Sequence, residues 1–133
     1  MIVPGNMKSR LSLGVLIALI GFVYGFARPA AAPMDISGTW IFSVDLESGG
    51  HGDPTFEFKQ DKENLSGSYD GPLGQYKVTG TIKENKAVFG FEFSRDGESH
   101  KATYTATVES ASKMSGTLVI TNGPTGKWTA TKK

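Results

Sequence analysis

Ile36-Ser37-Gly38-Thr39-Trp40 opens the patterned part of this chain, and the same five-residue phrase recurs three times further on. The phrase places an apolar residue, Ser or Thr, Gly, Ser or Thr, and a second apolar residue in succession. Its other copies are Leu65-Ser66-Gly67-Ser68-Tyr69, Val78-Thr79-Gly80-Thr81-Ile82 and Met114-Ser115-Gly116-Thr117-Leu118. A glycine on the same alternation face as the apolar residues is typical of a strand that bends or lies close to another backbone. The repeat therefore predicts a small closed β-sheet.

Apolar and polar residues alternate from Trp40 onward, with breaks rich in glycine or charge about every eight to twelve residues. This pattern is typical of a meander of short antiparallel strands. We predict an all-β fold, a single up-and-down barrel of eight strands, because closure removes exposed sheet edges. The strands are predicted over residues 38–46, 55–60, 65–69, 75–82, 87–94, 101–109, 114–121 and 126–132.

Taking alternate residues of these strands gives an apolar set that should face the interior of the barrel. Burying so many apolar side chains, at about 1.5 to 3 kcal/mol each, would stabilise a domain of this size. The predicted inward residues are Trp40, Phe42, Val44, Leu46, Phe56, Phe58, Leu65, Tyr69, Tyr76, Val78, Ile82, Phe89, Phe91, Phe93, Ala102, Tyr104, Ala106, Val108, Met114, Leu118, Ile120 and Trp128.

The amino-terminal region has the order of charge and hydropathy that a secretory signal shows. Lys8 and Arg10 precede an uncharged apolar run of 16 residues, 11–26, which is short for a membrane span of about 20 residues. We predict a signal peptide helix over residues 1–32, cleaved near residue 27 or 32, followed by the barrel domain over 33–133; an uncleaved membrane anchor is the alternative. The expected location is periplasmic or secreted.

Cysteine content and charge narrow the classes of function. The 133 residues include no cysteine, so the domain has no disulfide and no thiol nucleophile. Without Lys8, Arg10 and Arg28, the 14 basic residues fall to 11 against 13 acidic ones. We therefore expect no nucleic-acid partner, and no membrane contact apart from an uncleaved signal.

Successive connections of an up-and-down barrel alternate between its two ends, which sorts the predicted loops into two groups. Short charged loops gather at one end, at residues 61–64, 83–86 and 110–113. Longer loops rich in glycine and proline gather at the other, at residues 47–54, 70–74, 95–98 and 122–125. Binding residues are often carried by such loops over a rigid scaffold, so we place a functional mouth at the second end. The repeated glycines should form an inward ring at the first end, where Trp40 would plug the base.

The predicted ligand-binding residues lie at this mouth and in the part of the interior next to it. The aromatic run in this set would either line a cavity for an apolar ligand or fill a narrow barrel solidly, and the sequence leaves both open. The set comprises His51, Asp53, Tyr69, Asp70, Tyr76, Phe91, Phe93, Arg95, Tyr104 and Asn122.

Motifs for catalysis and metal binding are missing from the chain. His51, Asp53 and His100 lack the tight spacing of metal-ligand motifs, and no nucleophile elbow, phosphate loop or paired carboxylate motif occurs. We therefore predict no catalytic residues, no metal, no cofactor and no enzymatic activity.

The phrase Ser37-Gly38-Thr39-Trp40, together with Leu65-Ser66-Gly67-Ser68-Tyr69 and the late Trp128, resembles the calycin group of barrels. This group includes avidin-like proteins, lipocalins and small periplasmic inhibitors. The avidin-like biotin site is not matched, because Ile41-Phe42-Ser43-Val44-Asp45 follows the opening and no tryptophan lies between Trp40 and Trp128. The resemblance implies a non-enzymatic exported barrel.

Two functions follow as hypotheses from different classes. The first is binding of a small apolar or amphipathic ligand at the glycine-rich end. The second is a protein-binding module, such as an inhibitor of an exported hydrolase, with a solidly filled barrel. The partner would be a small ligand or an exported protein, and the chain would be a monomer or a dimer.

Overall fold

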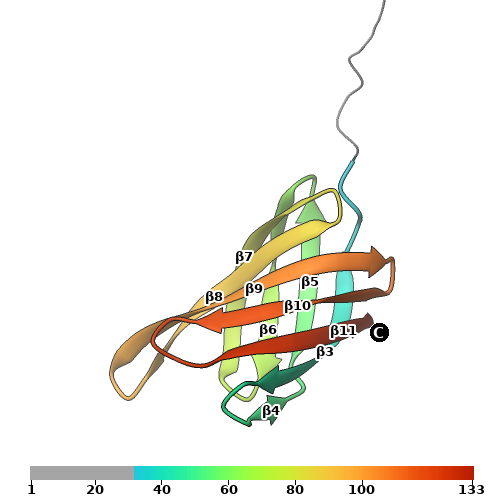
Figure 1. The fold of residues 1–133 in the computed structure, drawn as a ribbon. Coiled ribbons are helices and arrows are strands. Elements are labelled where there is room, and N and C mark those ends of the chain that lie inside the picture. The colour runs from blue at the N-terminus through green and yellow to red at the C-terminus, as the bar shows by residue number, and fades with distance from the viewer. Residues whose placement is uncertain (1–31) are drawn as a thin grey trace, which may run out of the picture. The chain divides into compact units, whose positions relative to one another are not determined.

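The computed structural model describes residues 32–133, which form one closed antiparallel β-barrel without helices (Figure 1). The predicted signal peptide lies outside the described residues, apart from Ala32. Among residues 32–133, no helix is long and apolar enough to cross a membrane.

All eight predicted strands are present, and their observed ends differ from the predicted ones by three residues at most. A ninth strand of two residues, β4, lies inside the segment predicted as the loop 47–54. The strands are β3 (Gly38–Leu46), β4 (His51–Gly52), β5 (Thr55–Asp61), β6 (Asn64–Gly71), β7 (Gly74–Lys83), β8 (Lys86–Arg95), β9 (Glu98–Ser110), β10 (Lys113–Ile120) and β11 (Thr125–Lys132).

Each long strand pairs antiparallel with the next, and β11 pairs with β3 to close the sheet. The closing register extends from Gly126 opposite Leu46 to Lys132 opposite Trp40. The first half of β3 pairs with β5, and its second half pairs with β4. Two residues are too few to show an alternation pattern, which is why sequence reasoning missed β4.

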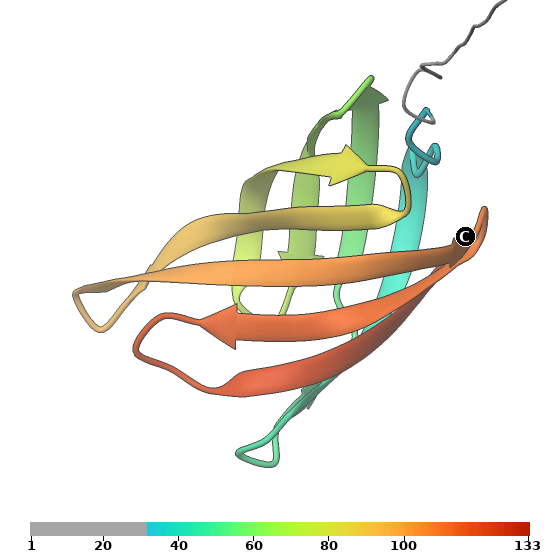
Figure 2. The same cartoon turned by 45° about the horizontal axis from the view of Figure 1, so that its top comes forward.

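The barrel has two different ends, and Figures 1 and 2 show the connections that define them. At the closed end, tight turns at 62–63, 84–85 and 111–112 join the strands. At the open end lie the β3–β5 connection with β4, the turns at 72–73 and 96–97, and the loop at 121–124. The predicted difference in length is wrong for two of these connections, because 72–73 and 96–97 are two-residue turns as tight as those at the closed end.

The segment before β3 covers the closed end. Ile36 is fully buried, and its carbonyl accepts a hydrogen bond of 2.9 Å from the indole Nε1 of Trp40. The backbone N–H of Met34 donates to the carbonyl of Glu84 in the β7–β8 turn, at 2.9 Å. Trp40 is fully buried as predicted, and Ile36 joins it in closing the base.

Glycines in the middle of strands permit close approach of neighbouring backbones, as the repeat predicts. A Cβ atom at Gly116 would collide with the carbonyl oxygen of Thr105 on β9, and one at Gly67 would collide with that of Glu57 on β5. The repeated glycines are not paired with one another, because Gly67 pairs with Val78 on β7 and Gly116 pairs with Trp128 on β11. The glycines therefore act separately, each where its own strand approaches a neighbour.

Aromatic rings fill the half of the interior next to the closed end. Phe42 packs between Phe56 and Trp128, with ring centroids 4.3 and 4.6 Å apart, and Phe58 packs on Phe89 at 4.8 Å. Of the predicted inward residues, only Leu46 and Tyr76 are half-buried rather than buried. The buried core contains three further residues that the alternation analysis missed, Ile36, Ala87 and Ala130.

We predict that Gly116→Ala destabilises the barrel by about 2 kcal/mol or more. The added methyl group would collide with the backbone carbonyl of Thr105, which cannot move aside as a flexible side chain can. The matched control is Gly50→Ala, whose new methyl group would meet only the Leu46 side chain. Urea unfolding followed by far-UV circular dichroism measures both free energies. Equal stabilities of the two variants would show that close approach at Gly116 is unimportant.

Candidate functional site

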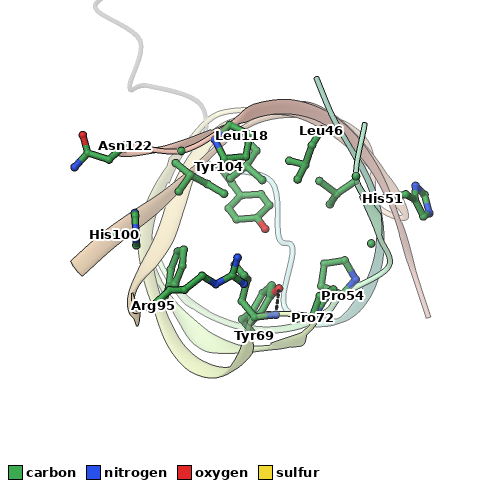
Figure 3. Close-up of a pocket in the computed structure, with 18 residues that line it drawn as sticks. Leu46, His51, Pro54, Tyr69, Pro72, Arg95, His100, Tyr104, Leu118 and Asn122 are labelled. Atoms are coloured by element: carbon green, nitrogen blue, oxygen red, sulfur yellow. Dashed lines mark hydrogen bonds between the residues drawn. The ribbon is translucent and has the colours of Figure 1, made fainter. Parts of the chain in front are cut away.

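A cavity of about 410 Å³ opens at the open end of the barrel, above the aromatic core (Figure 3). Its 18 lining residues come from β3, β4, β6, β8, β9 and β10 and from three of the four connections at this end, all except the turn at 96–97. A volume of this size lies within the range typical of small-molecule sites, roughly 300 to 1,000 Å³. The apolar part of the wall consists of Val44, Leu46, Pro54, Pro72, Leu73, Phe93, Leu118, Ile120 and Pro124.

Tyr104 on β9 forms the boundary between the filled core and the cavity. Its ring stacks on Phe89, with centroids 5.4 Å apart and planes at 8°, and meets the edge of Phe56 at 5.0 Å. Only 2% of the residue is exposed, and burial raises the pKa of its phenol. Figure 3 shows its hydroxyl directed into the cavity. Within residues 32–133 this hydroxyl has no hydrogen-bond partner.

The opposite wall carries Tyr69 on β6, which is held by the β6–β7 turn. Its hydroxyl accepts a long hydrogen bond of 3.4 Å from the backbone N–H of Leu73. Burial is the largest cause of the raised pKa of Tyr69, and the nearby charge of Arg95 acts in the opposite direction. In Figure 3 the side chain of Arg95 reaches from the end of β8 across the mouth toward Tyr69.

Six of the ten predicted site residues line the cavity, namely His51, Tyr69, Phe93, Arg95, Tyr104 and Asn122. Two of these six border it without offering their side chains to a ligand, because the side chains of His51 and Asn122 point away from the cavity in Figure 3. Among the predicted residues, the polar side chains available to a ligand are therefore those of Tyr69, Arg95 and Tyr104.

The other four predicted residues lie outside the cavity. Asp53 and Asp70 are exposed on the outer rim. Phe91 is buried behind the wall, stacked on the parallel ring of Tyr76 with centroids 5.2 Å apart. The Tyr76 hydroxyl donates to the carbonyl of Leu73 at 2.9 Å, which fixes the β6–β7 turn from behind. Phe91 and Tyr76 therefore support the wall instead of lining it.

Sequence reasoning missed most of the aliphatic wall. Leu46, Leu118 and Ile120 were predicted to face inward, and their position next to the open-end loops was the signal that could have assigned them to the site. Pro54, Pro72 and Pro124 supply a second signal, since three of the four connections at the open end contain a proline.

His100 also lines the cavity, and its geometry fixes its tautomer. Nδ1 lies 2.9 Å from the carbonyl oxygen of Thr121, which can only accept, so Nδ1 carries the proton. Nε2 lies 3.8 Å from a carboxylate oxygen of Glu98. The ring stacks on Phe93 with centroids 5.3 Å apart. His100 therefore ties the β8–β9 hairpin to the β10–β11 loop.

His51 forms an ion-paired cluster on the outside of the rim. Its Nδ1 lies 2.7 Å from Asp45 and its Nε2 lies 3.0 Å from Asp53. Carboxylates only accept hydrogen bonds, so both ring nitrogens must carry protons to satisfy both contacts. Among residues 32–133, no group of three or more side chains is arranged to hold a metal ion. The cluster is thus a clamp on the β4 segment.

No protein-family model matches the sequence, and no curated protein matches it. Solved structures with the same fold include designed barrels. A redesigned β-barrel, b11L5F_LGL, has a TM-score of 0.58 and 14% identity over 74% of this chain and 91% of its own. Another redesigned barrel, mFAP0, solved bound to DFHBI, has a TM-score of 0.56 and 16% identity over 73% of this chain and 98% of its own.

A further match is a de novo designed fluorescence-activating β-barrel, with a TM-score of 0.55 and 17% identity over 73% of this chain and 93% of its own. At these identities the likeness concerns the fold. The chain is a small eight-stranded antiparallel β-barrel.

We predict that His51 titrates above its ordinary pKa of 6.5, because hydrogen bonds first to Asp45 and then to Asp53 favour the charged ring. A raised pKa means that the clamp is fully formed below 6.5 and is lost as the pH rises through the higher value. The histidine ring proton shifts measured by NMR against pH give the midpoint. Asp45→Asn should lower it; a midpoint at or below 6.5 in the unsubstituted protein would contradict the clamp.

Proposed function

We propose that this protein binds one small apolar or amphipathic molecule in the cavity at its open end. The cavity combines an aliphatic wall with a few polar groups that converge on the same space, as small-molecule sites commonly do. An eight-stranded barrel is wide enough either to be filled by side chains or to hold one small ligand. Here the aromatic residues fill the half of the interior next to the closed end, and the half next to the open end contains the cavity.

The observation that carries the proposal is the Tyr104 hydroxyl at the floor of the cavity. A buried phenol normally finds a hydrogen-bond partner, and leaving a buried polar group unpaired costs about 1 to 3 kcal/mol. Tyr104 is almost completely buried, and the described part of the chain supplies no partner for its hydroxyl. A ligand atom that accepts a hydrogen bond would supply it.

The designed barrel mFAP0 gives a physical precedent, since it was solved with DFHBI bound. It shares the fold of this chain and not its side chains, so it supports the capacity of such a barrel and says nothing about ligand identity. The protein-binding alternative expects a solidly filled barrel. The cavity at the open end therefore favours a small ligand over a protein partner.

We also propose that the protein acts outside the cytoplasm, as a non-enzymatic member of the calycin-like barrels. The support for export is the order of Lys8, Arg10 and the apolar run at 11–26. The support for binding without catalysis is that His51, the best candidate for acid-base chemistry, is held by two carboxylates outside the cavity.

Filling the cavity from its wall should abolish binding. We predict that Leu118→Trp reduces the affinity for N-phenylnaphthylamine, an uncharged fluorophore that brightens in apolar surroundings, at least about tenfold because the indole would occupy the ligand's space. The matched control is Val119→Trp, whose side chain lies on the outside of the same strand and is 50% exposed. Fluorescence titration measures both affinities.

Ile120→Trp is the second cavity variant, placed nearer the rim, and circular dichroism confirms that each variant is folded. If folded variants at 118 and 120 bind the probe as tightly as Val119→Trp does, the ligand does not occupy this cavity. Failure of the unsubstituted protein to bind the probe at all would also count against the proposal.

A further inference from the structure

The side chains that line the cavity carry only one sign of charge. The permanently charged side chain among the 18 lining residues is Arg95, and no Asp or Glu is among them. The ring of His51 is turned outward to Asp45 and Asp53, so it adds no charge to the interior. The domain as a whole differs, because residues 32–133 carry 13 acidic and 11 basic side chains. The interior of the mouth is therefore more basic than the domain as a whole.

The carboxylates near the rim are engaged elsewhere or lie outside. Asp45 and Asp53 hold His51 on the outer surface, and Glu98 faces His100 at 3.8 Å. Asp70, near Tyr69, is exposed and accepts a hydrogen bond from the Gln75 side chain at 3.4 Å. None of them neutralises the charge at the mouth by direct contact.

Arg95 is the base that has no such partner. Within residues 32–133 no carboxylate oxygen lies within salt-bridge distance of its guanidinium, whereas His51 and His100 each have an acidic neighbour. Figure 3 shows this side chain extended over the mouth and turned toward Tyr69. A guanidinium presents several N–H donors in a planar fork, which suits a carboxylate, sulfonate or phosphate group.

We propose that the ligand is an amphipathic organic anion, with its charged group at Arg95 and its apolar body between Leu46, Leu118 and Ile120. Such a molecule fits both parts of the site, since the aliphatic wall takes the apolar body and the rim takes the charge. An atom at the inner end that accepts a hydrogen bond would reach the Tyr104 hydroxyl. This inference rests on the proposed function and adds the class of ligand.

The test compares two fluorescent probes that share the same ring system and differ in one charged group. Anilinonaphthalene sulfonate carries a sulfonate, and N-phenylnaphthylamine lacks it. The full chain should bind the anionic probe more tightly. Arg95→Gln should weaken the sulfonate probe roughly three- to tenfold, as expected for one partly exposed charge-assisted contact, and should change the affinity for the uncharged probe by a smaller factor.

Lys101→Gln is the matched control, because it removes one positive charge from an exposed residue close to the mouth that does not line the cavity. Added salt should weaken the sulfonate probe in the unsubstituted protein more than in Arg95→Gln. Equal affinity for both probes, or equal losses in Arg95→Gln and Lys101→Gln, would overturn the anion assignment and leave the cavity as an uncharged-ligand site. Binding of neither probe would instead refute the proposed function itself.

Discussion

The pairing of β3 with β11 closes the sheet, and closure fixes the width of the interior. Once the width is set, the sizes of the inward side chains decide where the barrel is solid and where it is hollow. Phe42, Phe56 and Trp128 pack ring against ring in the half next to the closed end and leave no space for a ligand there. At the open end the inward aliphatic residues Val44, Leu46, Leu118 and Ile120, together with Tyr69, Phe93 and residues of the connections, line a cavity instead of filling the space.

Closure also explains the mid-strand glycines. Neighbouring strands of a small barrel approach so closely at Gly67 and Gly116 that a Cβ would strike a carbonyl oxygen of the next strand. Closing the sheet thus depends on sites with no side chain, and it needs no disulfide. The segment with Ile36 completes the closed end, so the interior opens to solvent at one end. Tyr104 lies where the filled and hollow halves meet. Its ring belongs to the core, stacked on Phe89, and its hydroxyl belongs to the cavity.

The strand pattern was predictable because inward apolar residues alternate strictly with polar ones over most of the chain from Trp40 to Trp128. The site was predictable only in part. The open end was identified from its loops, and Tyr69, Arg95 and Tyr104 were among the predicted residues. Periodicity gives the face of the sheet on which a residue lies but not its depth along the barrel axis, so Phe91 and Leu118 look equivalent in sequence although one lies behind the wall and the other lines the cavity. The outward orientation of His51 depends on the pairing of β4 with β3. A strand of two residues is too short to give an alternation pattern from which this pairing could be predicted.

The central claim is that a ligand binds in the cavity at the open end and reaches no deeper than Tyr104. Intermolecular NOEs between bound N-phenylnaphthylamine and assigned side-chain protons of the full chain test it most directly. The structure predicts NOEs from the probe to Leu46, Leu118 and Tyr104, and none to Phe58 or Met114 in the filled half. NOEs confined to outward residues such as Val88 and Val119, or reaching Phe58, would contradict it.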